Sequence, residues 1–239
     1  MSAKRFFAEK IEGDIATVGG EEYTHARTVL RVGVGTEIVL LDGAGREFDG
    51  VVVRTDKSGM QVHILSAREG EKEPKAQITL LAGYLKNADR NEFIVQKAVE
   101  LGVSRIAFFS SEYSSAYMNE NKLERLKKVA KEATKQCLRS RVPEVSYFSD
   151  FREALVFGAQ AKTRLFACEF EKKSEVDLKA LSSPCTLVVG SEGGFSEREY
   201  EEAKSLGYRG VSLGKRILRA ETAAIALLSV AAFSLGEWE

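Results

Sequence analysis

From about residue 75 onward, short apolar segments alternate with segments of helical periodicity, and this alternation limits the possible folds most strongly. Strands are predicted at residues 78–81, 105–109, 164–168, 186–189 and 211–213. Helices are predicted between them, at residues 92–101, 122–139, 196–206 and 221–235. Strands that alternate with helices form a mostly parallel sheet with helices on both faces. We therefore expect an α/β domain in this part of the chain.

The first 70 residues or so have a different pattern, which is typical of a small β-rich module. Strands are predicted at residues 36–42, 47–54 and 60–65, with a turn signal at residues 43–45 and a short helix at residues 21–30. Short strands at such close spacing suggest a small barrel. The charged run 68–75 contains Gly70 and Pro74 and predicts a linker. We therefore expect two domains, at residues 1–72 and 73–239.

Composition excludes several classes of protein. With 44% hydrophobic and 29% charged residues, the 239-residue chain can form a packed core. Three cysteines without Cys-x-x-Cys spacing and two distant histidines predict neither a disulfide framework nor a metal site, and favour a reducing compartment. The apolar run 223–235 is shorter than the about 20 residues that span a bilayer. The expected protein is soluble and cytoplasmic, with no metal and no membrane contact.

The charges balance over the whole chain but not locally. There are 35 basic and 35 acidic residues, yet residues 122–141 hold eight basic and two acidic ones. Within the predicted helix, Lys127, Lys131, Lys135 and Arg139 recur at four-residue steps on one face. This row is either an ordinary solvated face or a ridge that faces nucleic-acid phosphates. Arg139 and Arg141, just before Pro143, keep the second interpretation open.

Two glycine-bearing loops, residues 190–196 and 213–222, directly follow predicted strands. In open α/β sheets, ligands bind at the carboxyl ends of the strands, so both loops are expected to point at one site. Neither loop has the complete pattern of a phosphate loop or of a dinucleotide site, which favours a neutral or zwitterionic ligand. Helix capping alone explains part of the first loop, because Ser196 and Glu199 have the spacing of a capping box.

The two loops, GSEGGFS at 190–196 and LGKRILRAETA at 213–223, resemble the signature loops of the RsmE family. These SPOUT-class methyltransferases modify N3 of a uridine in 16S ribosomal RNA. The resemblance covers essentially the whole chain and includes residues 86–92, 96–103, 136–143, 5–7, 25, 29–31 and 42–43. The family usually has proline at the positions of Ser191 and Lys215, glutamate at Lys135 and glycine at Leu138.

The resemblance implies a fold and a cofactor. The C-terminal domain would be a trefoil-knotted SPOUT (α/β-knot) domain and the N-terminal one a PUA-like RNA-binding β-barrel. The protein would be a homodimer that acts on 16S ribosomal RNA or the small ribosomal subunit. S-adenosylmethionine would be bound by Cys168, Glu169, Val189, Gly190, Glu192, Gly194, Leu213, Ile217, Leu218 and Thr222.

The implied reaction needs an unpaired or flipped-out uridine whose N3 anion is stabilised. Arg219 is the first candidate for that role, with Arg141 or Arg139 in support, and Glu192 or Glu221 is a candidate general base. The expected RNA contacts are Arg5, Lys86, Arg90, Arg139 and Arg141. Two alternatives stay open: a ribosome-assembly protein that has lost catalysis, and a related knotted methyltransferase that acts on transfer RNA or on a ribose 2′-oxygen.

Overall fold

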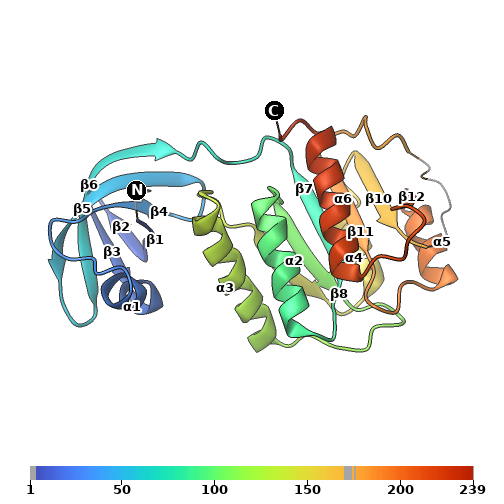
Figure 1. The fold of residues 1–239 in the computed structure, drawn as a ribbon, viewed down its shortest axis with the longest axis horizontal. Coiled ribbons are helices and arrows are strands. Elements are labelled where there is room, and N and C mark those ends of the chain that lie inside the picture. Colours follow the sequence, from blue (N-terminus) through green and yellow to red (C-terminus); the bar gives the residue numbers. More distant parts are fainter. Residues whose placement is uncertain (1–3, 170–173, 175, 239) are drawn as a thin grey trace. The chain divides into compact units, whose positions relative to one another are not determined.

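The computed structural model describes residues 4–169, 174 and 176–238, which form two compact units (Figure 1). The first unit comprises Met1–Glu73 and Thr134–Val142, and the second comprises Pro74–Ala133 and Pro143–Glu239. The first boundary between the two units, after Glu73, lies one residue beyond the boundary predicted from the sequence. The return of Thr134–Val142 to the first unit was not predicted, because it depends on contacts between residues far apart in the sequence.

The first unit is built on a six-stranded mixed sheet in the order β1-β4-β5-β6-β3-β2. Its elements are β1 (Arg5–Phe7), β2 (Lys10–Glu12), β3 (Ile15–Gly19), α1 (Gly20–Thr28), β4 (Glu37–Leu41), β5 (Arg46–Thr55) and β6 (Gly59–Glu69). The β1–β4 pair is parallel and the others are antiparallel. Phe6, Leu40 and Val62 lie in the core, against which Tyr23 and Ala26 of α1 pack.

The three strands and the helix predicted for this unit are confirmed, and β1 to β3 were missed. Two of the missed strands have only three residues, too few to show an alternating pattern. The linker prediction was wrong for Arg68 and Glu69, which end β6. Arg68 is held there because it lies opposite Glu47 and forms ion pairs with Glu47 and Asp49 of β5.

The second unit has a six-stranded, fully parallel sheet in the order β12-β10-β11-β7-β8-β9. Its strands are β7 (Ile78–Gly83), β8 (Arg105–Phe109), β9 (Glu144–Phe148), β10 (Thr163–Ala167), β11 (Cys185–Val189) and β12 (Arg209–Val211). Its helices are α2 (Ala88–Glu100), α3 (Glu120–Gln136), α4 (Phe151–Gly158), α5 (Glu197–Ser205) and α6 (Ala220–Ser234), with the last residues of α3 assigned to the first unit.

Helices cover both faces of this sheet, which confirms the predicted α/β architecture. Helices α2 and α6 pack against each other, with α6 over β11 and β7, while α4 packs on β7 to β9 and contacts α5 (Figure 1). Every residue of β7 and β11 is buried, as expected for strands with both faces covered. The missed elements, β9 and α4, are short and follow each other closely.

The capping box is also confirmed. Ser196 accepts a hydrogen bond from the backbone of Glu199, and Glu199 accepts one from the backbone of Ser196, at the start of α5.

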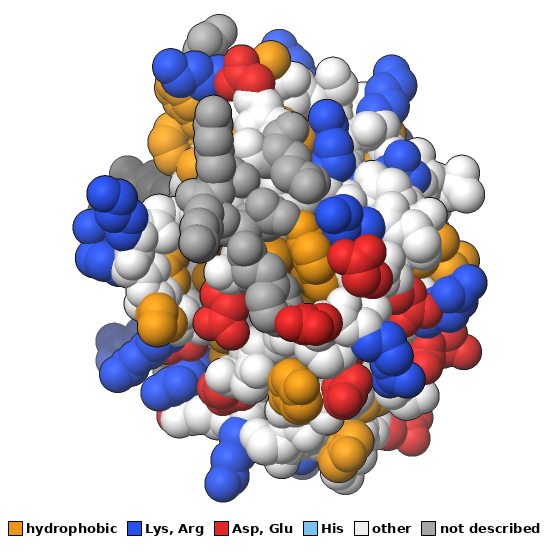
Figure 2. Space-filling model, turned by 90° about the vertical axis from the view of Figure 1, so that its right-hand side faces the viewer, with side chains coloured by type: hydrophobic (Ala, Val, Ile, Leu, Met, Phe, Trp, Pro, Cys, Tyr) orange, Lys and Arg blue, Asp and Glu red, His pale blue; other side chains and the backbone are white. Residues whose placement is uncertain are grey.

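On the side of α5, β10 and β12, acidic and basic side chains are interspersed with small hydrophobic groups (Figure 2). No helix in the described part of the chain is long and apolar enough to cross a membrane.

Candidate functional site

The carboxyl ends of β10, β11 and β12 open onto a cavity of about 520 Å³. It is lined by the segments that follow these three strands, by the start of α6 and by Arg90 of α2. Because β12, β10 and β11 are neighbours in a parallel sheet, their following loops meet at one edge. The prediction that both glycine-bearing loops point at one site is confirmed, and the cavity has the size of an ordinary small-molecule site.

Close packing explains why glycine begins the first loop. A side-chain carbon at Gly190 would lie 2.9 Å from the ring of Phe195, which is buried beneath the loop. The same loop presses on the end of β7, where a side chain at Gly83 would collide with the backbone of Ser191. These glycines therefore let the loop turn tightly over the sheet and keep its backbone at the cavity wall.

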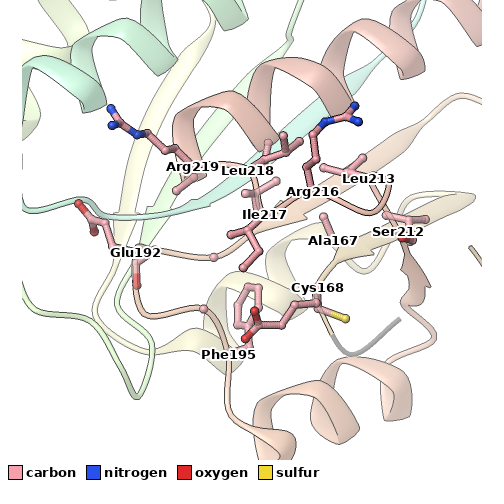
Figure 3. Close-up of a pocket in the computed structure, with 18 of the residues that line it drawn as sticks. Ala167, Cys168, Glu192, Phe195, Ser212, Leu213, Arg216, Ile217, Leu218 and Arg219 are labelled. Carbon is pink, nitrogen blue, oxygen red and sulfur yellow. The ribbon is translucent and has the colours of Figure 1, made fainter. Parts of the chain in front are cut away.

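The cavity has an apolar wall with one unusually exposed member. Ile217 is 92% exposed, although it lies between Leu213 and Leu218, which are partly buried. Figure 3 shows Ile217 extending from its loop toward Phe195 of the opposite loop. Leaving an isoleucine in water forgoes about 1.5–3 kcal/mol of burial, so this side chain is a natural contact for an apolar part of a ligand.

Polar groups surround this wall. The Oγ atom of Ser191 is buried and has no hydrogen-bond partner among the described residues. Glu192 is exposed, and its Oε1 accepts a hydrogen bond from the backbone N–H of Lys86 at 3.2 Å. In the view of Figure 3, Glu192 and Arg219 lie on one side of Ile217 and Arg216 lies on the other. The site thus combines an apolar surface with charged groups at its rim.

Nine of the ten residues predicted to hold a cofactor line the cavity, and Thr222 does not. Thr222 lies in the first turn of α6 with its side chain exposed, whereas Ala220 and Ala223 of the same helix face the cavity. Successive helical residues point in different directions, so the neighbours of a lining residue need not line the same cavity. We therefore no longer assign Thr222 to this site.

Arg90 was predicted as an RNA contact, and the structure places it in the cavity wall. Its Nε atom lies 3.5 Å from Oε1 of Glu221, at the start of α6. The sequence carries no signal for this position, because α2 and α6 are neighbours only in the folded chain. The catalytic candidate Arg219 also lines the cavity and is exposed, at the residue that precedes α6.

Two other predicted RNA contacts, Arg5 and Arg139, form ion pairs with glutamates of the first unit. Arg5 lies 2.5 Å from Glu47 and Arg139 lies 3.1 Å from Glu73, and the two arginine side chains are only 12% and 5% exposed. Ser140 joins the same network by donating to Glu47 at 2.5 Å. These guanidinium groups hold the segment 134–142 on the sheet of the first unit. We therefore no longer assign Arg5 and Arg139 to RNA binding.

The charged network changes the acidity of Glu47. Burial alone would raise its pKa, but hydrogen bonds from Arg5 and Ser140 and the charge of Arg5 outweigh that effect, so the pKa is lowered. Arg141 differs from its neighbour Arg139 because its side chain is exposed, near Gly45. Arg141 belongs to the first unit and is not among the residues that line the cavity.

The predicted row of cations is not a free phosphate-facing ridge. Lys127 pairs with Glu124 at 2.7 Å, Lys135 pairs with Glu22 at 2.7 Å, and Arg139 is buried against Glu73. The ridge interpretation was therefore wrong for Lys135 and Arg139, because carboxylates hold both of these side chains within the fold. Lys127, whose side chain is 45% exposed, fits the alternative of a solvated face.

Comparison with known proteins identifies the class first. Residues 71–232 match the model of the RNA methyltransferase domain, and residues 18–65 match that of the RNA methyltransferase PUA domain. The parallel α/β unit thus corresponds to the RNA methyltransferase domain, and most of the N-terminal β unit corresponds to the PUA domain. The PUA-like assignment of the N-terminal unit agrees with the expectation from the sequence.

Individual relatives narrow the class. The ribosomal RNA small subunit methyltransferase E of Mesomycoplasma hyopneumoniae is 32% identical over 74% of this chain and 79% of its own length. That of Bacillus subtilis is 27% identical over 96% of each chain. The Neisseria gonorrhoeae enzyme bound to S-adenosyl methionine superposes with a TM-score of 0.88, 29% identity and complete coverage of both chains. The chain belongs to the ribosomal RNA small subunit methyltransferase E family.

Proposed function

We propose that this protein transfers the methyl group of S-adenosylmethionine to N3 of a uridine in 16S ribosomal RNA of the small ribosomal subunit. One observation carries the proposal: two glycine-bearing loops enclose a cavity whose wall includes the almost fully exposed Ile217. The N. gonorrhoeae enzyme, which covers the whole chain, is described as bound to S-adenosyl methionine.

The residues present fit such a cofactor. Leu213, Ile217 and Leu218 would hold the flat face of its adenosine, and the backbone groups of both loops would bind its polar edges. The orphaned Oγ of Ser191 marks a polar position in the wall that no described residue satisfies. Cys168, Glu169, Val189, Gly190 and Gly194 complete the set that would hold the cofactor.

When bound, the cofactor supplies an electrophilic methyl group on its sulfonium. The protein must then favour the uridine anion, whose charge spreads onto O2 and O4. Arg219 can stabilise that charge, because it lies exposed at the cavity and a guanidinium keeps its charge at all relevant pH values. Glu192 is better placed than Glu221 to receive the proton, since Glu192 is exposed in the cavity wall and Glu221 is largely buried beside Arg90.

The proposal extends to RNA contacts and assembly. Lys86, Arg90 and Arg141 are the remaining candidates for RNA contacts, and Arg141 for a supporting role in catalysis. We also propose that the chain forms a trefoil knot between residues 190 and 222, that the protein is a homodimer, and that it is located in the cytoplasm. Phe93 of α2 and Phe233 of α6, which are 44% and 64% exposed on two helices that pack together, are apolar groups that a second copy of the chain would cover in the homodimer.

The test is methyl transfer from labelled S-adenosylmethionine to small subunits purified from cells that lack this modification, with the product nucleoside identified by mass spectrometry. Stoichiometric N3-methyluridine is the expected result. Transfer to a different nucleoside, or to transfer RNA instead of the subunit, would assign another substrate. Absence of both transfer and cofactor binding would favour an assembly protein without catalysis.

A further inference from the structure

The loop between β8 and α3, residues 110–119, brings an exposed tyrosine to the edge of the candidate cofactor cavity. Tyr113 is 51% exposed. A side-chain carbon at Gly193, which lines the cavity, would lie 2.7 Å from both the Cβ and the carbonyl oxygen of Tyr113. The backbone of Tyr113 is therefore in direct contact with the glycine-bearing loop after β11, while the residue as a whole remains half exposed.

The backbone around Tyr113 is held by a buried carboxylate. Glu199 is only 3% exposed, and it accepts hydrogen bonds from the backbone of Glu112 at 2.8 Å and from the backbone of Ser196 at 2.9 Å. The side chain of Glu112 also contacts Ser196, because it accepts a hydrogen bond from the Ser196 hydroxyl at 2.9 Å. One carboxylate thus ties the loop after β8 to the loop after β11, directly before the tyrosine.

The residues that follow Tyr113 are also ordered. Ser111 and Ser114 form a closed turn, in which the Ser111 N–H donates to the Ser114 hydroxyl at 2.8 Å and the Ser114 N–H donates to the Ser111 carbonyl at 3.0 Å. The ring is consequently presented from a backbone fixed on both sides. Such an aromatic loses little conformational entropy when a ligand covers it.

We propose that Tyr113 is a stacking platform for an unpaired RNA base that flanks the nucleotide entering the cavity. The proposal rests on the proposed function, because a nucleotide withdrawn from its stack leaves its neighbours without stacking partners. Aromatic side chains are the usual replacement, and they accept any base because every base has a flat face. A phosphate is the less suitable ligand here, since Glu112 directly precedes Tyr113 and Glu192 lies in the neighbouring cavity wall.

The experiment compares Tyr113→Ala, Tyr113→Phe and Tyr113→Trp in the full-length protein. Tyr117→Ala is the matched control, because Tyr117 is 70% exposed in the same loop, and the hydrogen bond that Lys122 donates to its carbonyl oxygen is retained by the substitution. Small ribosomal subunits lacking the modification serve as substrate. Affinity for the subunit, affinity for S-adenosylmethionine, and KM and kcat for methyl transfer are measured for each variant.

Tyr113→Ala is expected to raise KM and the dissociation constant for the subunit about tenfold, the size of one lost stacking contact. Its affinity for S-adenosylmethionine stays unchanged, and the Phe and Trp variants bind the subunit like the unsubstituted protein. Unchanged subunit affinity in Tyr113→Ala would overturn the proposal. So would a parallel loss of cofactor affinity, or an equal loss in Tyr113→Phe, since each indicates a role other than stacking.

The proposed function and the platform can fail separately. If the methylated nucleoside is not N3-methyluridine, the proposed function is wrong, while the comparison of KM values still decides the role of Tyr113. If the unsubstituted protein transfers no methyl group, the difference in subunit affinity between Tyr113→Ala and Tyr117→Ala decides whether Tyr113 is a stacking platform. Equal affinities in these two variants would then reject the platform.

Discussion

The ammonium group of Lys135 lies 2.7 Å from Oε1 of Glu22, and both side chains are only 12% exposed. The ion pair joins the segment 134–142 to α1 within the first unit. Lys135 also lies over the ring of Phe7, at 6.0 Å from its centroid.

Reversing one charge of this pair should destabilise the first unit. Lys135→Glu places two carboxylates together in a largely buried site, and loss of such a pair costs about 3 kcal/mol. We expect a lower denaturation midpoint, with recovery in the double variant Lys135→Glu/Glu22→Lys. Circular dichroism during urea unfolding measures both. A double variant that is no more stable than Lys135→Glu would show that the pairing is not the cause.

Leu138 adopts a left-handed backbone conformation, with φ at 64°. This conformation is costly for any residue with a Cβ atom, whereas glycine adopts it freely. Because Leu138 is 38% exposed, its removal sacrifices little packing. Leu138→Gly should therefore raise the free energy of unfolding by about 1 kcal/mol. Leu138→Ala, which keeps the strain, should give no such increase, and an equal gain in both variants would contradict the explanation.

The lowered pKa of Glu47 predicts a direction for the pH dependence of stability. In the unfolded chain this carboxyl titrates near its ordinary value of 4.5, and in the folded chain it titrates lower. The folded state therefore binds fewer protons, so the contribution of Glu47 to stability is complete above pH 4.5 and is lost as the pH falls through the folded pKa. Glu47→Gln should flatten the decline in unfolding free energy below pH 4.5. If the unfolding free energy of Glu47→Gln declines with falling pH as steeply as that of the unsubstituted protein, Glu47 is not the source of the decline.

Ile217 offers a test of the cofactor wall that leaves the fold intact. Since the side chain is 92% exposed, Ile217→Ala should leave the thermal midpoint within about 1 °C of the original value. The dissociation constant for S-adenosylmethionine should rise about tenfold, because the bound ligand loses an apolar contact. Isothermal titration calorimetry provides the measurement. Val156→Ala, at an exposed position of α4 outside the cavity, is the control and should bind the cofactor normally.

Local sequence patterns predicted the features that depend on neighbouring residues. The strand at residues 105–109 was predicted with the bounds that the structure has, because five consecutive residues form a mostly apolar, buried run. The capping box of Ser196 and Glu199 was likewise visible, since its partners are three residues apart. The convergence of residues 190–196 and 213–222 followed from the rule that parallel strands end at a common edge.

Tertiary structure alone decided which of the predicted charges face a ligand. Arg139 and Arg141 are equivalent in the sequence, yet the first is buried against Glu73 and the second is exposed. Glu47 and Ser140, which organise this network, are 93 residues apart, and Gly193 and Tyr113 belong to loops after different strands. The sequence by itself determined the class of fold and the loops of the site, because periodicity reports which residues are buried. It did not determine these partners, because they depend on where distant segments meet once the sheets have formed.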